Sequence, residues 1–398
     1  MTASEQTTDI VEGLPTARSC PFSPPDALGE LRERRPIARM SYADGTLGWL
    51  ITDHDLGREL LTHPDFSSRH ELRSSPVPMA IKPMPAPPGM FIGMDPPEHT
   101  RYRKPLNRHF TVRRVRELEP AIQRIVTQHI DTMERQGPPA DLVGSFALPI
   151  PVQVISELLG AEPGISEEIS RLRALTLDPA TPPEEAGAAV RATNAVMAEL
   201  VRSKRRAPSD DLLGVLIADG EMTDEELTGL AFLMFIAGHE TTANMFSLGT
   251  YLALRDDKVR AGLTGVTVLS DEAVNEFLRY LSIVQFTSRA ALADVEIGGV
   301  LVRKGETVTL SISAANRDAR RFPDPDGFDF HGTENSHLAF GHGIHQCIGH
   351  NLARAELKIG LPELFRRLPG LRLADASREV ATRTGHNTYG VLELPVAW

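Results

Sequence analysis

Cysteine is scarce in this chain, with only Cys20 and Cys347 among 398 residues. Two cysteines this far apart do not suggest a disulfide framework, and their scarcity is typical of proteins in a reducing cytoplasm. Positive charge is also in short supply, because 42 lysines and arginines stand against 53 aspartates and glutamates, for a net charge of -11. This acidic balance argues against a general nucleic-acid or anionic-membrane binder, so any basic contact surface must be local.

The chain also lacks a hydrophobic run long enough to cross a membrane. Its most apolar stretch, from Leu230 to Gly238, reaches His239 after nine residues, whereas a membrane-spanning helix needs about 20. The polar N-terminus contains no apolar segment of the kind that a secretory signal requires. We therefore expect a cytoplasmic protein whose partners include no membrane and no nucleic acid.

Helical patterning, by contrast, is abundant. Apolar residues recur every three or four positions over residues 112–133 and elsewhere, which is typical of amphipathic helices. Alternating or β-branched residues are confined to short runs near Trp49, over 295–313 and over 389–398. Three stretches rich in proline or charge predict loops, at residues 74–90, 178–188 and 204–211. These patterns predict a mainly α fold with a small β-sheet region.

The longest predicted helix begins at a capping box formed by Thr223 and Glu226 and continues to about Leu254. At 1.5 Å per residue it is about 45 Å long, enough to cross a whole domain. Its middle carries the sequence AGHETT, in which Gly238 costs about 1 kcal/mol relative to alanine and a buried Glu240 costs more if unpaired. On these residues alone, a packing glycine and a salt-bridged glutamate explain the segment at least as well as a functional site does.

Cys347 lies in the sequence AFGHGIHQCIGHNLARAE, where glycine is frequent. Gly341, Gly343 and Gly349 allow the chain to turn tightly around the sulfur. An amphipathic helix follows, so the sulfur lies near a helix N-terminus, where the dipole favours a thiolate. Three interpretations remain open: a buried structural cysteine, a zinc site with His342, His345 and His350, or an axial ligand of haem iron.

The segment Phe340–Gly349 resembles the haem-ligand loop of the soluble bacterial cytochrome P-450 monooxygenases. AGHETT resembles the oxygen-activating segment of that family's long central helix, and Glu276 with Arg279 resembles its E-x-x-R pair. The pattern E-x-x-R occurs five times here, so only the position of Glu276, about 70 residues before Cys347, makes it specific. The resemblance extends over nearly the whole chain. It implies a single cytochrome P-450 domain over residues 1–398, with a flexible N-terminus over 1–20 and haem between the central helix and the cysteine loop.

The resemblance also implies the site. Cys347 would be the axial thiolate ligand to the iron of haem b, Phe340 would shield its sulfur, and Thr241 with Glu240 would form the alcohol and acid pair for oxygen activation. Further haem contacts would come from matching motif positions, several of them cationic partners for the haem carboxylates: His99, Arg103, Ala237, Gly238, Arg289, Phe340, Gly341, His345 and Gly349.

One position departs from the family pattern. The family usually has an arginine that joins Glu276 and Arg279 in a buried charge network, and Gly332 stands there in this sequence. Because removing one partner from such a network is costly, we expect His331, Arg320 or Arg321 to substitute for it.

The function implied by the resemblance is a monooxygenase that inserts one oxygen atom from O₂ into a C–H bond, by hydroxylation or epoxidation. The substrate would be a bulky hydrophobic small molecule of secondary metabolism. Leu233, Ala237 and residues 284–286 would line its pocket, together with the proline-rich loop and the segment near Asp178. The rival functions are a haem-binding sensor or carrier and a zinc hydrolase.

A ferredoxin and its reductase would supply the electrons. Residues 101–116 carry seven arginines or lysines and no acid, so this stretch is either a solvated helix face or the docking surface for an acidic ferredoxin.

Overall fold

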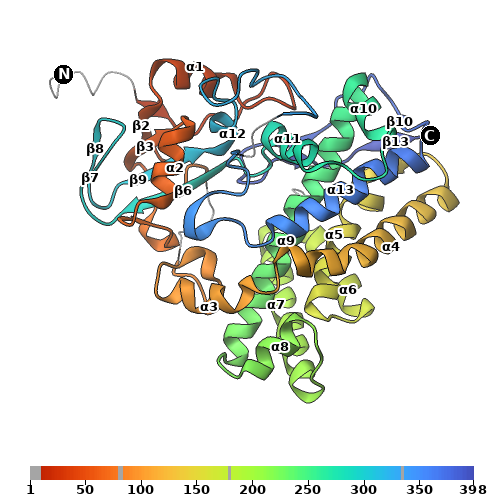
Figure 1. Cartoon of the computed structure of the whole chain (residues 1–398). Coiled ribbons are helices and arrows are strands. Elements are labelled where there is room, and N and C mark those ends of the chain that lie inside the picture. Colours follow the sequence, from red (N-terminus) through yellow and green to blue (C-terminus); the bar gives the residue numbers. More distant parts are fainter. Residues whose placement is uncertain (1–9, 79–83, 178–180, 333–335) are drawn as a thin grey trace.

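The computed structural model describes residues 10–78, 84–177, 181–332 and 336–398. Helices make up most of this structure, and the largest sheet lies to one side of them, at the left of Figure 1. The predicted fold class, mainly α with a small β-sheet region, is confirmed. None of the described helices combines the length and the hydropathy that a membrane span needs.

The helices account for the bulk of the core. In chain order they are α1 (Asp26–Arg34), α2 (His54–Thr62), α3 (Glu98–Asn107), α4 (Val112–Gln136), α5 (Pro149–Leu159), α6 (Pro163–Leu177), α7 (Pro183–Arg206), α8 (Leu212–Asp219), α9 (Asp224–Arg255), α10 (Asp257–Thr264), α11 (Asp271–Leu281), α12 (Ile312–Ala315) and α13 (His350–Arg367). Shorter helical turns are η1 (His70–Leu72), η2 (Phe91–Gly93), η3 (Val143–Ala147) and η4 (Gly343–His345).

The strands form one larger sheet and three small ones. The larger sheet has the order β1-β2-β3-β9-β6-β4, from β1 (Val11–Glu12), β2 (Ile37–Ser41), β3 (Leu47–Ile51), β9 (Thr307–Ser311), β6 (Phe286–Ala291) and β4 (Phe66–Ser67). The small sheets pair β7 (Val295–Ile297) with β8 (Val300–Val302), β11 (Thr382–Arg383) with β12 (Gly390–Val391), and β13 (Pro395–Ala397) with both β10 (Arg372–Leu373) and β5 (Ala140–Asp141). The strands predicted near Trp49, over 295–313 and near the C-terminus are thus present.

The long helix predicted from its capping box is α9. Thr223 is its N-cap, with both hydrogen bonds of the capping box formed to Glu226. α5, α7 and α13 all pack against α9, which runs through the middle of the molecule in Figure 1. The prediction of a central helix that crosses the domain is confirmed.

α13 crosses α9 closely because two positions lack side chains. A Cβ atom on Gly360 would lie 2.5 Å from the ring of Phe246 on α9, and a Cβ atom on Gly249 would lie 3.4 Å from Leu361. Contacts as short as the first are not tolerated in a packed core. The crossing therefore sets the position of the start of α13, and of the cysteine loop before it, relative to α9.

The structure shows more regular contacts than the sequence patterns suggest in two segments. Within residues 1–20, β1 pairs with β2 and Arg18 hydrogen-bonds to Ser23 and Gln285; residues 1–9 lie outside the described structure. Pro183 begins α7, where its missing N–H costs nothing, and α7 continues to Arg206. The loops predicted at 178–188 and 204–211 are therefore shorter than expected, and residues 79–83 and 178–180 are not described.

Candidate active site

Cys347 lies in a tight loop between η4 and α13. Its N–H donates to the carbonyl oxygen of Phe340 at 2.8 Å and closes the loop. Gly341 and Gly343 have φ values of 69° and 72°, a conformation that other residues rarely adopt. A Cβ atom on Gly343 would also lie 2.6 Å from the carbonyl oxygen of Leu61. The loop needs glycine at these two positions, as the sequence predicted.

The sulfur of Cys347 lies at the N-terminus of α13, also as predicted. Gly349 is the N-cap of α13, and its backbone N–H hydrogen-bonds to the Cys347 sulfur. Cys347 is exposed as a residue, but protein atoms surround its sulfur, and this burial raises the pKa of Cys347. The hydrogen bond from Gly349 and the positive charges of Arg103 and Arg354 act in the opposite direction and lower that pKa. A bound metal cation is the group that would convert this thiol to the thiolate near neutral pH.

The ring of Phe340 packs among polar groups behind the loop. The guanidinium of Arg354 lies 4.7 Å from the ring centroid, and the rings of His337 and His350 lie at 5.9 and 6.0 Å. A guanidinium at this distance makes a cation–π contact. These contacts hold the ring of Phe340 at the start of the loop that carries Cys347.

Two buried histidines from different elements meet near the loop. The rings of His99, on α3, and His345, on η4, are 4.2 Å apart. Both nitrogens of His99 and Nε2 of His345 are buried without a hydrogen-bond partner in the described structure. Burial lowers the pKa of His99 to about 4 and that of His345 to about 3. Unsatisfied buried nitrogens are costly, so this pair indicates a binding site for a polar ligand group.

Arginines surround the same two histidines. Arg289, Arg103 and Arg73 all act electrostatically on His345 and lower its pKa. Arg289 is only 6% exposed, and burial lowers its pKa to about 10. Arg73 donates to the carbonyl oxygen of Ser288, as Arg289 does, and neither of them has a carboxylate partner among the described residues. Arg103 donates to the carbonyl oxygen of Gln346.

This cluster fits an anionic cofactor. A concentration of buried cations without paired carboxylates is unfavourable unless an anion binds. Asp95 attracts His99 and Arg289, but its carboxylate already accepts hydrogen bonds from Ser67 and Ser68. The residues that the resemblance assigned to the haem carboxylates are thus brought together beside Cys347, and they match the charge and hydrogen-bonding needs of two carboxylates.

One face of α9 is accessible in the middle of the helix. Ala237 is exposed, and the hydroxyl of Thr241, one turn later, is accessible and donates to the Ala237 carbonyl at 3.0 Å. The rest of the helix centre is largely buried, including Leu233 and His239. Leu233, expected to line a pocket, is therefore buried, whereas Ala237 and Thr241 are accessible.

Gly238 and Glu240 face other elements. A Cβ atom on Gly238 would lie 3.3 Å from Ile155 of α5, so this glycine admits a close neighbouring helix. Glu240 accepts hydrogen bonds from Arg383 at 2.7 Å and from the hydroxyl of Thr388 at 2.8 Å. The packing explanation left open for these two residues therefore applies to both.

Glu276 and Arg279 on α11 form a buried bidentate pair, with both N–O distances at 2.7 Å. The expected substitute for the missing arginine is absent. Arg320 pairs with Asp53 and Asp318, Arg321 donates to Ser336, and the backbone N–H of His331 donates to Asp329. The second partner of Glu276 is instead the backbone N–H of Asp329, which donates to Oε1 at 2.9 Å. The prediction was wrong because the three candidates have other partners and a main-chain donor completes the contacts of Glu276.

The zinc interpretation finds no support in the described residues. The ring of His345 packs against that of His99 at a tilt of 50°, and Nδ1 of His350 lies 2.8 Å from the carbonyl oxygen of Cys347 itself. The described part of the chain gathers no group of three or more histidine, cysteine or acidic side chains that could hold a metal.

The basic stretch of residues 101–116 is partly neutralised. Arg101 pairs with Glu226, Arg108 with Asp219 and Arg114 with Glu117. Lys104 and Arg116 are exposed and form no ion pair within the described structure. The surface that remains available to a partner is therefore smaller than the sequence suggested.

The fold and the known proteins that it resembles define a protein of the cytochrome P450 class. The Cytochrome P450 family model matches residues 268–369, and a relative named pentalenic acid synthase, from Streptomyces avermitilis, is 42% identical over 97% of both chains. Vitamin D3 dihydroxylase from Streptomyces griseolus is 40% identical over 99% of this chain and 98% of its own. The crystal structure of CYP105P1 in complex with filipin I matches with a TM-score of 0.87 and 40% identity, over 98% of this chain and 99% of that one. The chain belongs to the cytochrome P450 family and is a P450 monooxygenase.

Three residues of the site could not be identified from motifs. Arg73 follows η1 in a segment with no recognisable pattern, and Arg383 and Thr388 lie on a C-terminal hairpin of which the sequence predicted only the second strand, β12. The approach of Arg73 to the two histidines, and of Arg383 to Glu240, depends on the folding together of distant segments.

Proposed function

We propose that Cys347 is the axial ligand of haem b and that the cluster of His99, Arg103, Arg289 and His345, together with Arg73, binds the haem carboxylates. The observation that carries this proposal is the set of buried or half-buried arginines without carboxylate partners, together with unpaired histidine nitrogens, next to an accessible cysteine. Haem b supplies two carboxylates for the cluster and an iron for the thiolate. Around the ring, the further contacts would come from Ala237, Gly238, Phe340, Gly341 and Gly349.

Haem ligated by a thiolate supplies the activation of O₂, and the overall reaction places one oxygen atom in a substrate C–H bond and releases the other as water, using two electrons and two protons. Thr241 is placed to orient this chemistry, because its hydroxyl is accessible on the open face of α9. While its proton is donated to the Ala237 carbonyl, its oxygen can accept a hydrogen bond from a water or a ligand.

Glu240 is the acid that supplies protons to this face of α9. It is next to Thr241 in sequence, and its side chain is 17% exposed, so it lies between the protein interior and solvent. A carboxyl group in such a position can take up protons from outside and release them inside. The hydroxyl and the carboxyl together would move protons while the packed helix keeps bulk water out.

The substrate class we propose is a bulky hydrophobic small molecule of secondary metabolism. Ala237 gives the accessible face of α9 a small apolar surface, which suits a hydrophobic ligand. Two relatives of similar identity bear the names pentalenic acid synthase and vitamin D3 dihydroxylase. Val284 and Gln285, which are partly exposed at the start of β6, would form part of the pocket wall.

The electron donor we propose is an acidic ferredoxin with its reductase. Lys104 and Arg116 are exposed and form no ion pair among the described residues, and Arg103, next to Lys104 in sequence, donates to the carbonyl oxygen of Gln346 beside Cys347. An exposed cationic surface on a protein of net charge -11 attracts an acidic partner to that place in particular.

An absorption spectrum of the reduced protein under carbon monoxide tests the haem assignment. The wild-type protein should bind one haem and show the strongly red-shifted main band that thiolate ligation produces. Cys347→Ala should lose this band, while Cys20→Ala should keep it, since Cys20 lies in the N-terminal segment. A colourless wild-type protein, or an unchanged band in the Cys347 variant, would contradict the proposal.

A further inference from the structure

The C-terminal hairpin formed by β11 and β12 contacts the middle of α9. Arg383 and Gly390 are cross-strand partners in this hairpin, and a Cβ atom on Gly390 would lie 1.9 Å from the side-chain oxygen of Asn244. No side chain fits at that position, so the hairpin backbone lies directly on α9. Asn244 is one helical turn after Glu240, and Arg383 therefore reaches Glu240 from the opposite strand.

Two different donors from this hairpin converge on one carboxylate oxygen. Nη1 of Arg383 and the hydroxyl of Thr388 both donate to Oε1 of Glu240, at 2.7 and 2.8 Å. The side chains of Arg383 and Glu240 are 13% and 17% exposed. In such a partly buried setting, a charge-assisted hydrogen bond holds a carboxylate in one orientation more strongly than a surface pair would.

The hairpin is itself fixed at several points. Thr388 forms a bridge with Val284, the N–H of Tyr389 donates to Ile283, and the N–H of Gln285 donates to Asn387. The residues that orient Glu240 thus belong to a rigid element joined to the segment between α11 and β6, rather than to a free tail.

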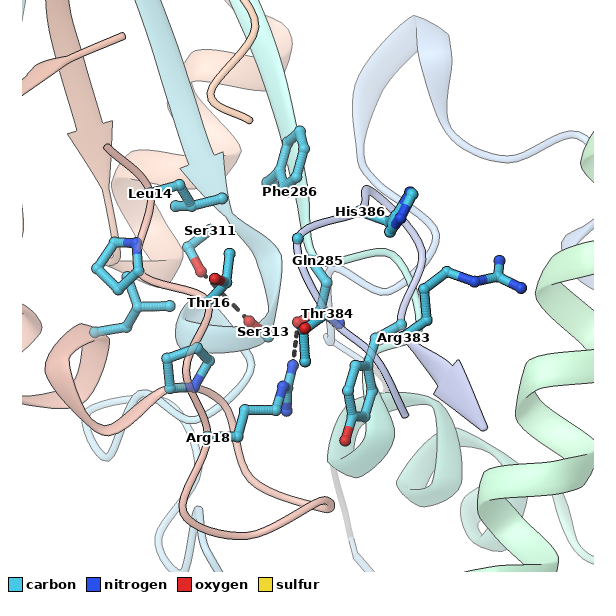
Figure 2. Close-up of a pocket in the computed structure, with 15 residues that line it drawn as sticks. Leu14, Thr16, Arg18, Gln285, Phe286, Ser311, Ser313, Arg383, Thr384 and His386 are labelled. Carbon is cyan, nitrogen blue, oxygen red and sulfur yellow. Dashed lines mark hydrogen bonds between the residues drawn. The ribbon is translucent and has the colours of Figure 1, made fainter. Parts of the chain in front are cut away.

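Arg383 also borders solvent on its other side. It lines a small pocket together with Arg18, Gln285, Thr384 and His386. Figure 2 shows Arg383 pointing away from Arg18 and Thr16, toward the green helix at the right. The stem of Arg383 is thus part of the pocket wall, while its guanidinium is directed to Glu240.

We propose that Arg383 and Thr388 are positioning residues for proton delivery, which hold the Glu240 carboxyl between the solvent side and Thr241. This inference rests on the proposed role of Glu240 as the acid of the relay. The hairpin fixes which way the carboxyl points, and protons taken up from the Arg383 side pass through Glu240 to the accessible face of α9. Both residues act on Glu240, the residue they contact directly.

Matched variants test the proposal in the haem-loaded protein, supplied with NADPH, a plant-type ferredoxin at saturation and its reductase. Arg383→Gln and Thr388→Val should each slow NADPH oxidation, the arginine variant by about tenfold, and should raise the solvent deuterium isotope effect. Arg383→Lys and Thr388→Ser keep a donor and should recover most of the rate. Arg378→Gln, which alters an exposed arginine on the same C-terminal segment paired with Glu393, should behave as wild type.

A double variant separates positioning from general damage. Glu240→Gln combined with Arg383→Gln should be no slower than Glu240→Gln alone, because both changes act on one carboxyl. Hydrogen exchange gives a readout that does not depend on turnover: the amides of Tyr389 and Leu392, which bond to Ile283 and Ala381, should exchange faster in Glu240→Gln and Arg383→Gln alike.

The outcomes distinguish this inference from the function on which it rests. If Glu240→Gln slows turnover but Arg383→Gln and Thr388→Val do not, the positioning role is refuted and the role of Glu240 stands. If Glu240→Gln itself leaves turnover and isotope effect unchanged, the relay assigned under the proposed function fails. If the Arg383 and Thr388 variants change only amide exchange, the contact is structural and the inference is overturned.

Discussion

Arg279 donates two hydrogen bonds to Glu276 in a buried pair, Nε to Oε2 and Nη2 to Oε1, both at 2.7 Å. Arg279 also donates to the carbonyl oxygens of Asn316, Pro325 and Gly327. α11 is thereby joined to the segments that follow α12. The pair is thus a connection between distant parts of the chain as well as an ion pair.

Glu276→Gln should destabilise the protein by about 3–5 kcal/mol, because it leaves the buried guanidinium of Arg279 without its counter-charge. Urea unfolding followed by circular dichroism measures this loss. Glu199→Gln is the control, since Glu199 forms an exposed E-x-x-R pair with Arg202 and its loss should have no measurable effect. Equal stability of the two variants would show that burial of the Glu276–Arg279 pair does not increase its contribution to the free energy of unfolding.

Gly332→Arg should be more stable than Gly332→Met by about 1 kcal/mol. A Cβ atom at this position would lie 3.6 Å from Oε2 of Glu276, so a cationic side chain can reach an oxygen that accepts only one hydrogen bond. Methionine provides a long side chain without the charge. Both variants place a long side chain at position 332, so the difference between their free energies of unfolding in urea reports the effect of the charge. A methionine variant at least as stable as the arginine variant would refute the electrostatic gain.

His337 should make the protein less stable in mild acid. Burial lowers the pKa of this histidine to about 3, whereas its ordinary value in an unfolded chain is about 6.5. Below pH 6.5, His337 therefore binds a proton in the unfolded chain but not in the folded protein. The folded protein loses stability progressively as the pH falls toward 3. The contribution of this one group at pH 5 is a loss of about 2 kcal/mol.

Unfolding measured between pH 7 and pH 5 checks this for the wild type and for His337→Asn. The other histidines titrate in both proteins, so the difference between the two curves isolates His337. The wild-type curve should fall more steeply, and parallel curves would show that the folded protein protonates His337 as readily as the unfolded chain.

Thr241→Ala should divert electrons from product or water to hydrogen peroxide, because the accessible hydroxyl on α9 is lost. The peroxide formed per NADPH consumed, with ferredoxin and its reductase, measures this. Thr241→Ser retains the hydroxyl and should stay close to wild type. Peroxide yields that remain low in the alanine variant would count against the role of Thr241.

Lys104→Glu should slow reduction of the protein by ferredoxin, roughly threefold to tenfold at low salt, with the difference shrinking as salt screens the charges. Stopped-flow reduction at two ionic strengths measures it. Arg171→Glu changes the charge equally on α6, where Arg171 forms an exposed pair with Glu168, and should have little effect. Equal slowing by both variants would indicate a response to net charge instead of local docking.

The sequence by itself predicted the features that depend on neighbouring residues. The capping box at Thr223 defines the start of α9, since its two hydrogen bonds join residues three positions apart. Gly341 and Gly343 allow the turn before Cys347 through their own backbone conformations. The resemblance of several motifs to those of the cytochrome P450 family, in the same order along the chain, identified His99, Arg103, Arg289 and His345 as candidates for one site.

Only the tertiary structure decided which groups face one another across long stretches of chain. It pairs Glu240 with Arg383, 143 residues away, brings Arg73 to the histidine cluster, and gives Glu276 a backbone partner at Asp329 in place of an arginine. Such contacts depend on how helices and strands pack, and no local periodicity or capping signal specifies them. The short-range pattern therefore determined the elements and the class of chemistry, while packing determined the partners of each charge.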